Sequence, residues 1–144
     1  MTRETAATRD ARFAALVARA EAAGHAAAAA AIPTPMVVVE TDGLSDRPTP
    51  GGRSWVVNEG PCGFAWIVVR PGGSSFARWA KANDEARRPD GSTYPAWSNH
   101  YYGGLSRWVG EFGQSVTRKE AFATAYAEVL REAGINATSG SRLD

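Results

Sequence analysis

Apolar residues in the first part of the chain recur with the period of an α-helix. Alanine, the strongest helix former, dominates residues 4–31, and Pro33 blocks any continuation. Four apolar residues follow the i, i+3, i+4, i+7 spacing of one helix face: Phe13, Leu16, Val17 and Ala20. The pattern predicts a helix over residues 4–31 that Gly24 breaks or caps. Because its apolar stripe is narrow, we expect it to dock on the rest of the chain or on a second copy.

Proline and glycine punctuate residues 33–53 and give this segment the composition of a linker. The apolar run Met36–Val39 inside it has the residue types of an edge strand, where proline is tolerated. Further along, β-branched and aromatic runs predict strands over residues 54–57, 63–70, 97–102, 105–109 and 136–143. A short helix is expected after Ser74 or Ser75, and residues 84–96 have the polar, proline-containing composition of a surface loop.

Glycines mark two turns in the C-terminal half. Gly103 and Gly104 lie between β-prone runs and predict a tight hairpin turn, because both turn positions need a positive φ. The register of a two-residue turn gives two cross-strand pairs: His100 with Arg107, and Asn99 with Trp108. Gly134 has the position of a left-handed C-cap.

A second long helix is predicted over residues 117–133. Thr117 and Glu120 have the spacing of a capping box at its start. Its apolar stripe consists of five residues: Phe122, Ala125, Tyr126, Val129 and Ala133. We expect the last helix to bury Phe122 and Val129.

The order of elements predicts an α+β fold. Residues 63–144 have the succession β-α-β-β-α-β of the split βαβ, or ferredoxin-like, arrangement. In this arrangement two helices cover one face of a four-stranded antiparallel sheet, and here an N-terminal helix and edge strands would be added. We expect residues 1–144 to form a single domain, with an Ala-rich helix over 1–32, a Pro/Gly-rich linker over 33–53 and an α+β core over 54–144.

Charge and cysteine content narrow the classes of function. Basic and acidic residues number 16 and 15, which argues against a protein that binds by bulk neutralisation of phosphates. Cys62 is the one cysteine, so no intramolecular disulfide forms and a reducing compartment is expected. The N-terminal sequence lacks the apolar core of a signal peptide, and no apolar run is long enough for a membrane span. We therefore expect a cytoplasmic protein that does not insert into membranes.

Few residues suggest catalysis. Cys62 and His100 could form a nucleophile and base, but Cys62 opens a strongly apolar strand, where a buried, inert thiol is the usual outcome. One cysteine and two distant histidines do not have metal-ligand spacing. We expect no enzyme activity, no metal and no cofactor, and we keep a Cys/His enzyme as the weakest alternative.

Aromatic residues on the predicted sheet are the candidate binding site. Phe64 and Trp66 alternate with smaller apolar residues and point to the same side of their strand. The candidate site combines aromatic side chains that could stack bases with arginines that could contact phosphates: Phe64, Trp66, Arg70, Tyr101, Arg107 and Trp108. Two arrangements remain open. Either this face is an open platform for single-stranded nucleic acid or nucleotides, or residues 4–57 cover it as a second core layer. We favour the covered face, because the N-terminal helix needs somewhere to dock.

Several short motifs occur in an order that resembles a known family. They are Cys62-Gly-Phe-Ala-Trp, Phe76-Ala-Arg-Trp, Tyr102-Gly-Gly, Gln114-Ser115, the helix ending Val-Leu-Arg-Glu-Ala-Gly-Ile, and Ser141-Arg-Leu-Asp. Over roughly residues 33–144 the chain resembles a family of small uncharacterised proteins encoded by tailed bacteriophages. The resemblance implies a phage origin and the cytoplasm of a bacterial host, but no chemistry.

Together these observations predict a non-enzymatic accessory protein that binds a host macromolecule, for host takeover or defence evasion. A host protein is the first expected partner, and single-stranded nucleic acid is the alternative. A homodimer through the N-terminal helix is also open.

Overall fold

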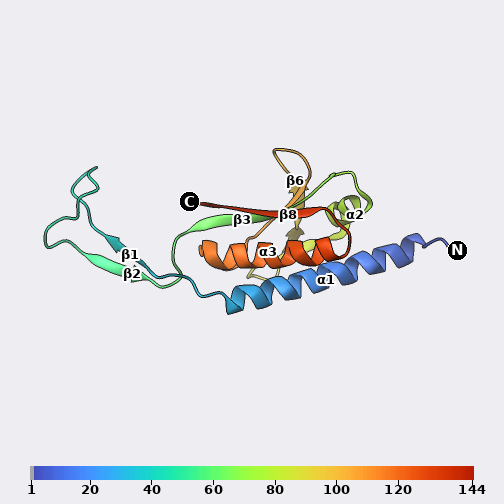
Figure 1. Ribbon diagram of the computed structural model, residues 1–144, viewed down its shortest axis with the longest axis horizontal. Coiled ribbons are helices and arrows are strands. Elements are labelled where there is room, and N and C mark those ends of the chain that lie inside the picture. The colour runs from blue at the N-terminus through green and yellow to red at the C-terminus, as the bar shows by residue number, and fades with distance from the viewer. Residues whose placement is uncertain (1) are drawn as a thin grey trace.

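The centre of the protein is an antiparallel sheet of four strands in the order β6–β7–β3–β8. The computed structural model describes residues 2–144 (Figure 1). The strands of this sheet are β3 (Gly63–Val69), β6 (Trp97–Asn99), β7 (Leu105–Trp108) and β8 (Ala137–Leu143). Ala65, Ile67 and Val69 of β3 are fully buried beneath the helices, as the alternation of strand side chains requires. The structure confirms the predicted α+β class.

Helices cover one face of this sheet in two layers. α3 (Val116–Glu132) packs on β3 and β8, and α1 (Ala6–Ala30) lies along α3 on the side away from the sheet (Figure 1). α2 (Ser75–Asn83) lies near one end of α1, where the rings of Phe13 and Phe76 meet edge to face at 5.4 Å. All four predicted stripe residues of α1 are buried. The apolar stripe that suggested a homodimer therefore packs within the same chain.

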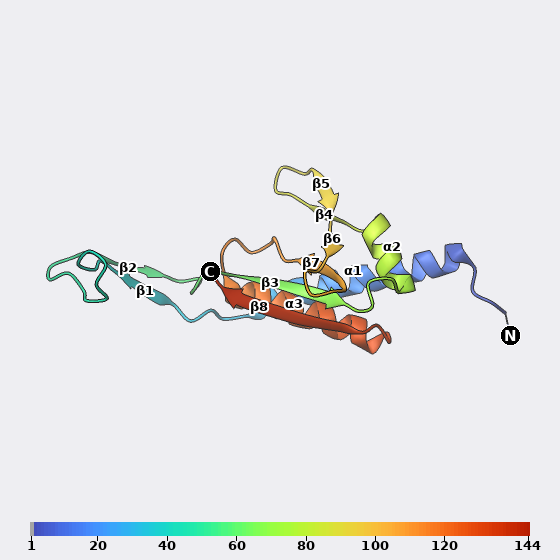
Figure 2. The ribbon, with the colours of Figure 1, turned by 90° about the horizontal axis from the view of Figure 1, so that it is seen from above.

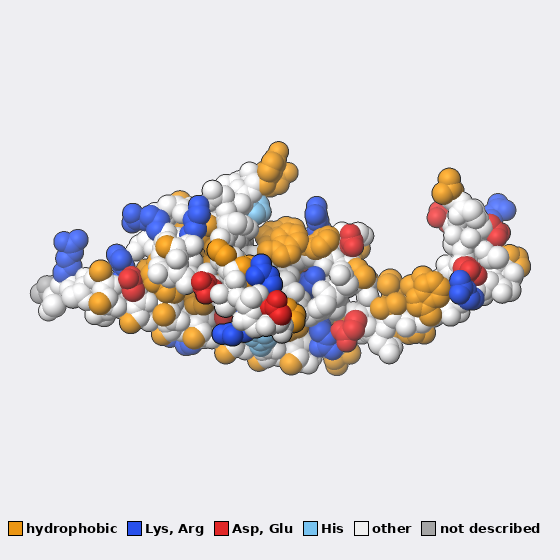
Figure 3. Space-filling view, turned by 180° about the vertical axis from the view of Figure 1, so that it is seen from behind, with side chains coloured by type: hydrophobic (Ala, Val, Ile, Leu, Met, Phe, Trp, Pro, Cys, Tyr) orange, Lys and Arg blue, Asp and Glu red, His pale blue; other side chains and the backbone are white. Residues whose placement is uncertain are grey.

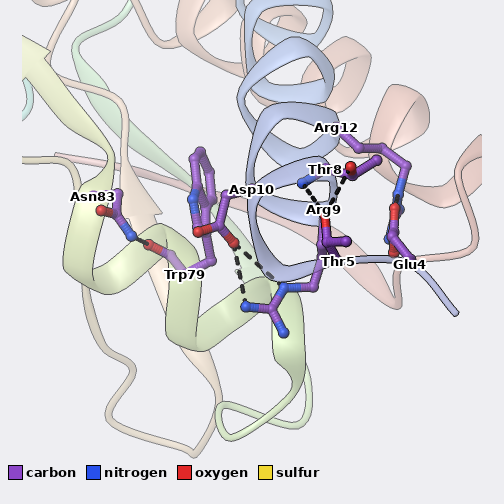
Figure 4. A network of polar contacts seen from close by, with 8 residues as sticks. All are labelled: Glu4, Thr5, Thr8, Arg9, Asp10, Arg12, Trp79 and Asn83. Carbon is purple, nitrogen blue, oxygen red and sulfur yellow. Dashed lines mark hydrogen bonds and ion pairs between the residues drawn. The ribbon is translucent and has the colours of Figure 1, made fainter.

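α1 begins at a cap and continues through the break that the sequence predicts at Gly24. The Thr5 side chain accepts a hydrogen bond from the Thr8 N–H, and Arg12 pairs with Glu4 at 2.8 Å (Figure 4). The expected break at Gly24 is wrong, because the helix runs through it to Ala30. Contact with α3, rather than backbone freedom, accounts for glycine at this position.

α3 starts and ends one residue earlier than predicted, and Gly134 caps its end as predicted. Ser115, not Thr117, is the N-cap, and its side chain accepts from the Arg118 N–H. At the other end Gly134 has φ 85°, and the Ile135 N–H donates to the Leu130 carbonyl at 3.0 Å. Phe122 is fully buried as expected. Val129 is only half-buried, because the helix is rotated so that Leu130 enters the core.

The β6–β7 hairpin has a different register from the predicted one. Its observed pairs are Trp97 with Arg107, Ser98 with Ser106, and Asn99 with Leu105. The predicted pairs of His100 with Arg107 and of Asn99 with Trp108 are wrong, because the turn contains more than the two glycines. The His100 N–H donates to the Gly104 carbonyl at 2.9 Å, so Tyr101 and Tyr102 lie in the loop. Gly103 and Gly104 do have the expected positive φ, at 89° and 90°.

Residues 84–96 also differ from the expected loop. β4 (Glu85–Arg87) and β5 (Thr93–Pro95) pair with each other in a small hairpin. Gly91, at φ 89°, allows the turn between them. The Trp97 indole donates to Asp84 at 2.7 Å and ties this hairpin to the main sheet.

A second ribbon projects away from the body. β1 (Met36–Val39) pairs only with β2 (Ser54–Val57) among the described strands, and Figures 1 and 2 show the ribbon extending beyond the end of α3. The predicted strand Met36–Val39 is confirmed. Residues 54–57, which the sequence assigned to the α+β core, pair with it outside the main sheet.

Candidate functional site

The face of the sheet opposite the helices carries a contiguous group of aromatic rings. The indoles of Trp66 and Trp108 are stacked, with centroids 5.9 Å apart and planes 10° from parallel. The ring of Phe64 lies 5.2 Å from that of Trp108. Gly140 of β8 leaves space for this group, because a Cβ there would lie 2.7 Å from the Trp66 indole nitrogen. We call Phe64, Trp66 and Trp108 the aromatic face.

The expectation that residues 4–57 cover this face is wrong. α1 packs on α3, on the other side of the sheet, and the β1–β2 ribbon extends away from it. Trp108 remains 46% exposed. The N-terminal helix therefore has its docking site without using the aromatic face.

A shallow pocket of about 320 Å³ adjoins the two indoles. Its lining includes Trp66 and Trp108 from the sheet, and Tyr101 and Tyr102 from the β6–β7 loop. Both tyrosines are exposed, and their rings meet at 4.9 Å. Arg142 of β8 also lines the pocket. The loop and the sheet thus bring four aromatic side chains to the rim of one depression.

Five of the six predicted site residues lie on this side of the molecule, and one does not. Arg70 follows the open-face alternation of β3 and contacts the glycine turn beside Gly104. Tyr101 lies in the loop rather than on a strand. The expectation that Arg107 contacts phosphates is wrong. Arg107 lies opposite Ile67 on the helix side of the sheet and is 1% exposed.

Arg107 instead joins the sheet to α1. Its Nη2 donates to Glu21 at 2.6 Å and to Glu111 at 2.9 Å, and its guanidinium lies 5.0 Å from the ring centroid of Phe122. Burial raises the pKa of Glu21, although the charge of Arg107 opposes the shift. Burial alone would lower the pKa of Arg107, but Glu21 and Glu111 raise it, so the guanidinium stays charged.

The sequence-based search missed Arg142. Its guanidinium lies 5.2 Å from the ring centroid of Phe64, its partner in the β3–β8 register. The signal was present in the predicted last strand, where Arg142 is the one charged residue of β8. Only the pairing of β8 with β3 shows that Arg142 lies on the same side of the sheet as Phe64.

Cys62 and His100 are not brought together. Cys62 precedes β3 and bridges to Ser115, whereas His100 lies in the loop beside Gly104, at the far end of β3. A strand of this length separates its two ends by about 20 Å, since each residue advances the chain about 3.3 Å. The two side chains therefore lie at opposite ends of the sheet.

The β1–β2 ribbon is the second candidate surface. Trp55, Val37 and Val56 are each more than half exposed. In the register Val37 lies opposite Val56, and Val38 lies opposite Trp55, so both faces of the ribbon are apolar. Figure 3 shows hydrophobic side chains gathered along this projection.

The base of the ribbon is held in place by α3. Arg118 donates to the Ala28 carbonyl at 2.6 Å, in the last turn of α1, and to the Ala31 carbonyl at 3.3 Å, where the chain leaves α1 toward the ribbon. It also donates to the Glu59 carboxylate at 2.6 Å, where the chain returns from the ribbon. The Ser115 hydroxyl donates to the Glu59 carbonyl at 2.9 Å. Both connections of the ribbon are thereby fixed to one end of α3. Sequence reasoning missed this role, because no local pattern links residues so far apart.

Comparisons of the chain with protein-family models, with curated proteins and with solved structures found no match. Within residues 2–144, no helix is both long and apolar enough to cross a bilayer.

Proposed function

We propose that this is a non-enzymatic binding protein that docks on another protein through its β1–β2 ribbon. The observation that carries the proposal is the exposure of apolar side chains on both faces of the ribbon, Val37 and Val56 on one and Trp55 on the other. An isolated two-stranded hairpin is marginally stable in water. Contiguous exposed apolar surface marks interaction sites in soluble proteins. A partner that covers the ribbon would stabilise the two-stranded hairpin and bury its exposed apolar side chains.

The anchoring by Arg118 supports this function. Because the guanidinium bonds Ala31 on the outgoing connection and Glu59 on the returning one, the ribbon leaves the body in a defined direction. Less of its freedom is then lost on binding, which favours affinity.

The phage resemblance suggests the setting. We propose a host protein as the partner and the cytoplasm of a bacterial host as the location. We further propose that β3-α2-β6-β7-α3-β8 is a ferredoxin-like unit, since its sheet order and antiparallel pairing match that arrangement. α1 is then an added helix outside this unit.

Affinity capture from nuclease-treated bacterial lysate tests the proposal. The bait variant is Trp55→Ser combined with Val56→Thr, and the matched control is Trp108→Ala, which truncates a similarly exposed tryptophan on the aromatic face. We expect proteins captured by the native chain to be lost with the ribbon variant and retained with the control. Sedimentation of the purified chain identifies the case in which the partner is a second copy. Capture unchanged by the ribbon substitutions, together with a monomeric native chain, would overturn the proposal.

A further inference from the structure

The aromatic face and the tyrosines of the β6–β7 loop have no part in ribbon docking. Trp66, Trp108, Tyr101 and Tyr102 lie around one depression of about 320 Å³ on the main sheet. The ribbon projects elsewhere. We propose that this depression is a binding site for single-stranded nucleic acid, in which bases stack on the aromatic side chains and the backbone lies along Arg142.

The geometry of the rings fits stacking. Trp66 and Trp108 form a nearly parallel pair, and Trp108 is 46% exposed, so its indole presents free surface to a base. Tyr101 is 91% exposed and Tyr102 is 81% exposed. Stacking on such side chains tolerates any sequence, since every base has a π face. Because strand side chains fix one part of the site and a hairpin loop the other, a base can enter between them.

Charge selects an anionic occupant. None of the four strands of the main sheet contains Asp or Glu. The guanidinium of Arg142 lies 5.2 Å from the ring centroid of Phe64. Among the described residues that line the pocket, none is acidic and Arg142 is basic. A lining with one basic residue and no acidic residue favours a phosphate backbone over an uncharged apolar peptide.

The expected ligand is single-stranded rather than duplex. The bases of a duplex are already stacked and paired, so they cannot reach side chains that lie flat on a sheet. A single strand presents unstacked bases together with its phosphates. The face is also shallow, which suits an extended chain.

Fluorescence anisotropy with a labelled oligothymidine of about 12 nucleotides, a length within the site sizes of single-strand binding folds, tests the site. Trp108→Ala should weaken binding roughly 5- to 150-fold, the range that corresponds to the loss of one stacked base. Tyr101→Ala should also weaken binding, and this exposed loop side chain can be removed without disturbing the core. Trp55→Ala on the ribbon is the matched control and should leave binding unchanged.

Salt dependence tests the role of Arg142. Arg142→Gln should lower the slope of log affinity against log salt by about 1, as expected for one lost phosphate contact. Arg53→Gln, which removes an exposed arginine of the ribbon region, should not change the slope. A duplex of the same length should bind much more weakly than the single strand.

Three results would overturn the site: no binding at low salt, equal binding of duplex and single strand, or native-like binding by both Trp108→Ala and Tyr101→Ala. A protein partner lost with these variants, in the absence of oligonucleotide binding, would assign the face to a peptide. None of these outcomes depends on the ribbon. Failure here is therefore distinguishable from failure of the proposed protein docking.

Discussion

The ring of Phe122 in α3 occupies the space that a side chain would need at Gly24 in α1. A Cβ at Gly24 would lie 2.6 Å from Cδ2 of Phe122, which is fully buried and packed against the rings of Phe112 and Tyr126. Glycine in the middle of a helix is therefore explained here by interhelical contact.

Gly24→Ala should lower the stability of the protein, against the helix preference of alanine. Alanine would gain about 1 kcal/mol of propensity, whereas forcing a methyl group into a packed core costs about 1–3 kcal/mol. Thermal unfolding should show a lower Tm. Combining the change with Phe122→Leu should cost less than the sum of the single changes, because the two sites share one space. A higher Tm for Gly24→Ala would contradict the contact.

Arg118→Gln should loosen the β1–β2 ribbon without unfolding the body. Its guanidinium bonds the Ala31 carbonyl and the Glu59 carboxylate, so its loss frees both connections of the ribbon. Amide hydrogen exchange should accelerate in residues 36–57, with smaller changes in β3. Arg131→Gln is the control, since Arg131 lies at the opposite end of α3 and donates to the Ala137 carbonyl. Equal acceleration in both variants would argue against an anchoring role.

Gly104→Ala should destabilise the hairpin more than Gly103→Ala. Both glycines have φ near 90°, a backbone conformation that is strained for alanine. Only at Gly104 would a Cβ also meet other atoms, 2.8 Å from the Val69 carbonyl oxygen. Urea unfolding should show a loss of about 1 kcal/mol for Gly103→Ala and a larger loss for Gly104→Ala. Equal losses would mean that the backbone can shift away from β3.

The burial of Glu21 beside Arg107 should make stability depend on pH. Burial raises the pKa of Glu21 above its ordinary 4.5 in the folded protein. The folded state therefore binds this proton more tightly than the unfolded state, and the contribution of Glu21 is greatest at low pH and declines as pH rises above 4.5. The free energy of unfolding of the native chain minus that of Glu21→Gln should thus fall from about pH 4 to about pH 6. A difference that rises over this interval would show that Arg107 outweighs burial.

Local features of the sequence determined most of the elements. Helical spacing identified the buried stripe of α1, and alternation in β3 separated Trp66 from Ile67 correctly. Gly134 ends α3 in the predicted conformation. These features depend on side-chain periods and on the φ that a residue tolerates, and both are properties of a few consecutive residues.

Tertiary structure decided where the elements face. Strand alternation already places Arg107 and its neighbour Trp108 on opposite faces, and the pairing of β7 with β3 showed that Arg107 is the one that faces Glu21 and is buried. The aromatic face is uncovered because α1 packs on α3, where the absence of a side chain at Gly24 leaves room for the ring of Phe122. Such choices depend on loop lengths and on contacts between segments far apart in the chain. A one-residue change of register reverses every facing of a strand, and no local pattern contains that information.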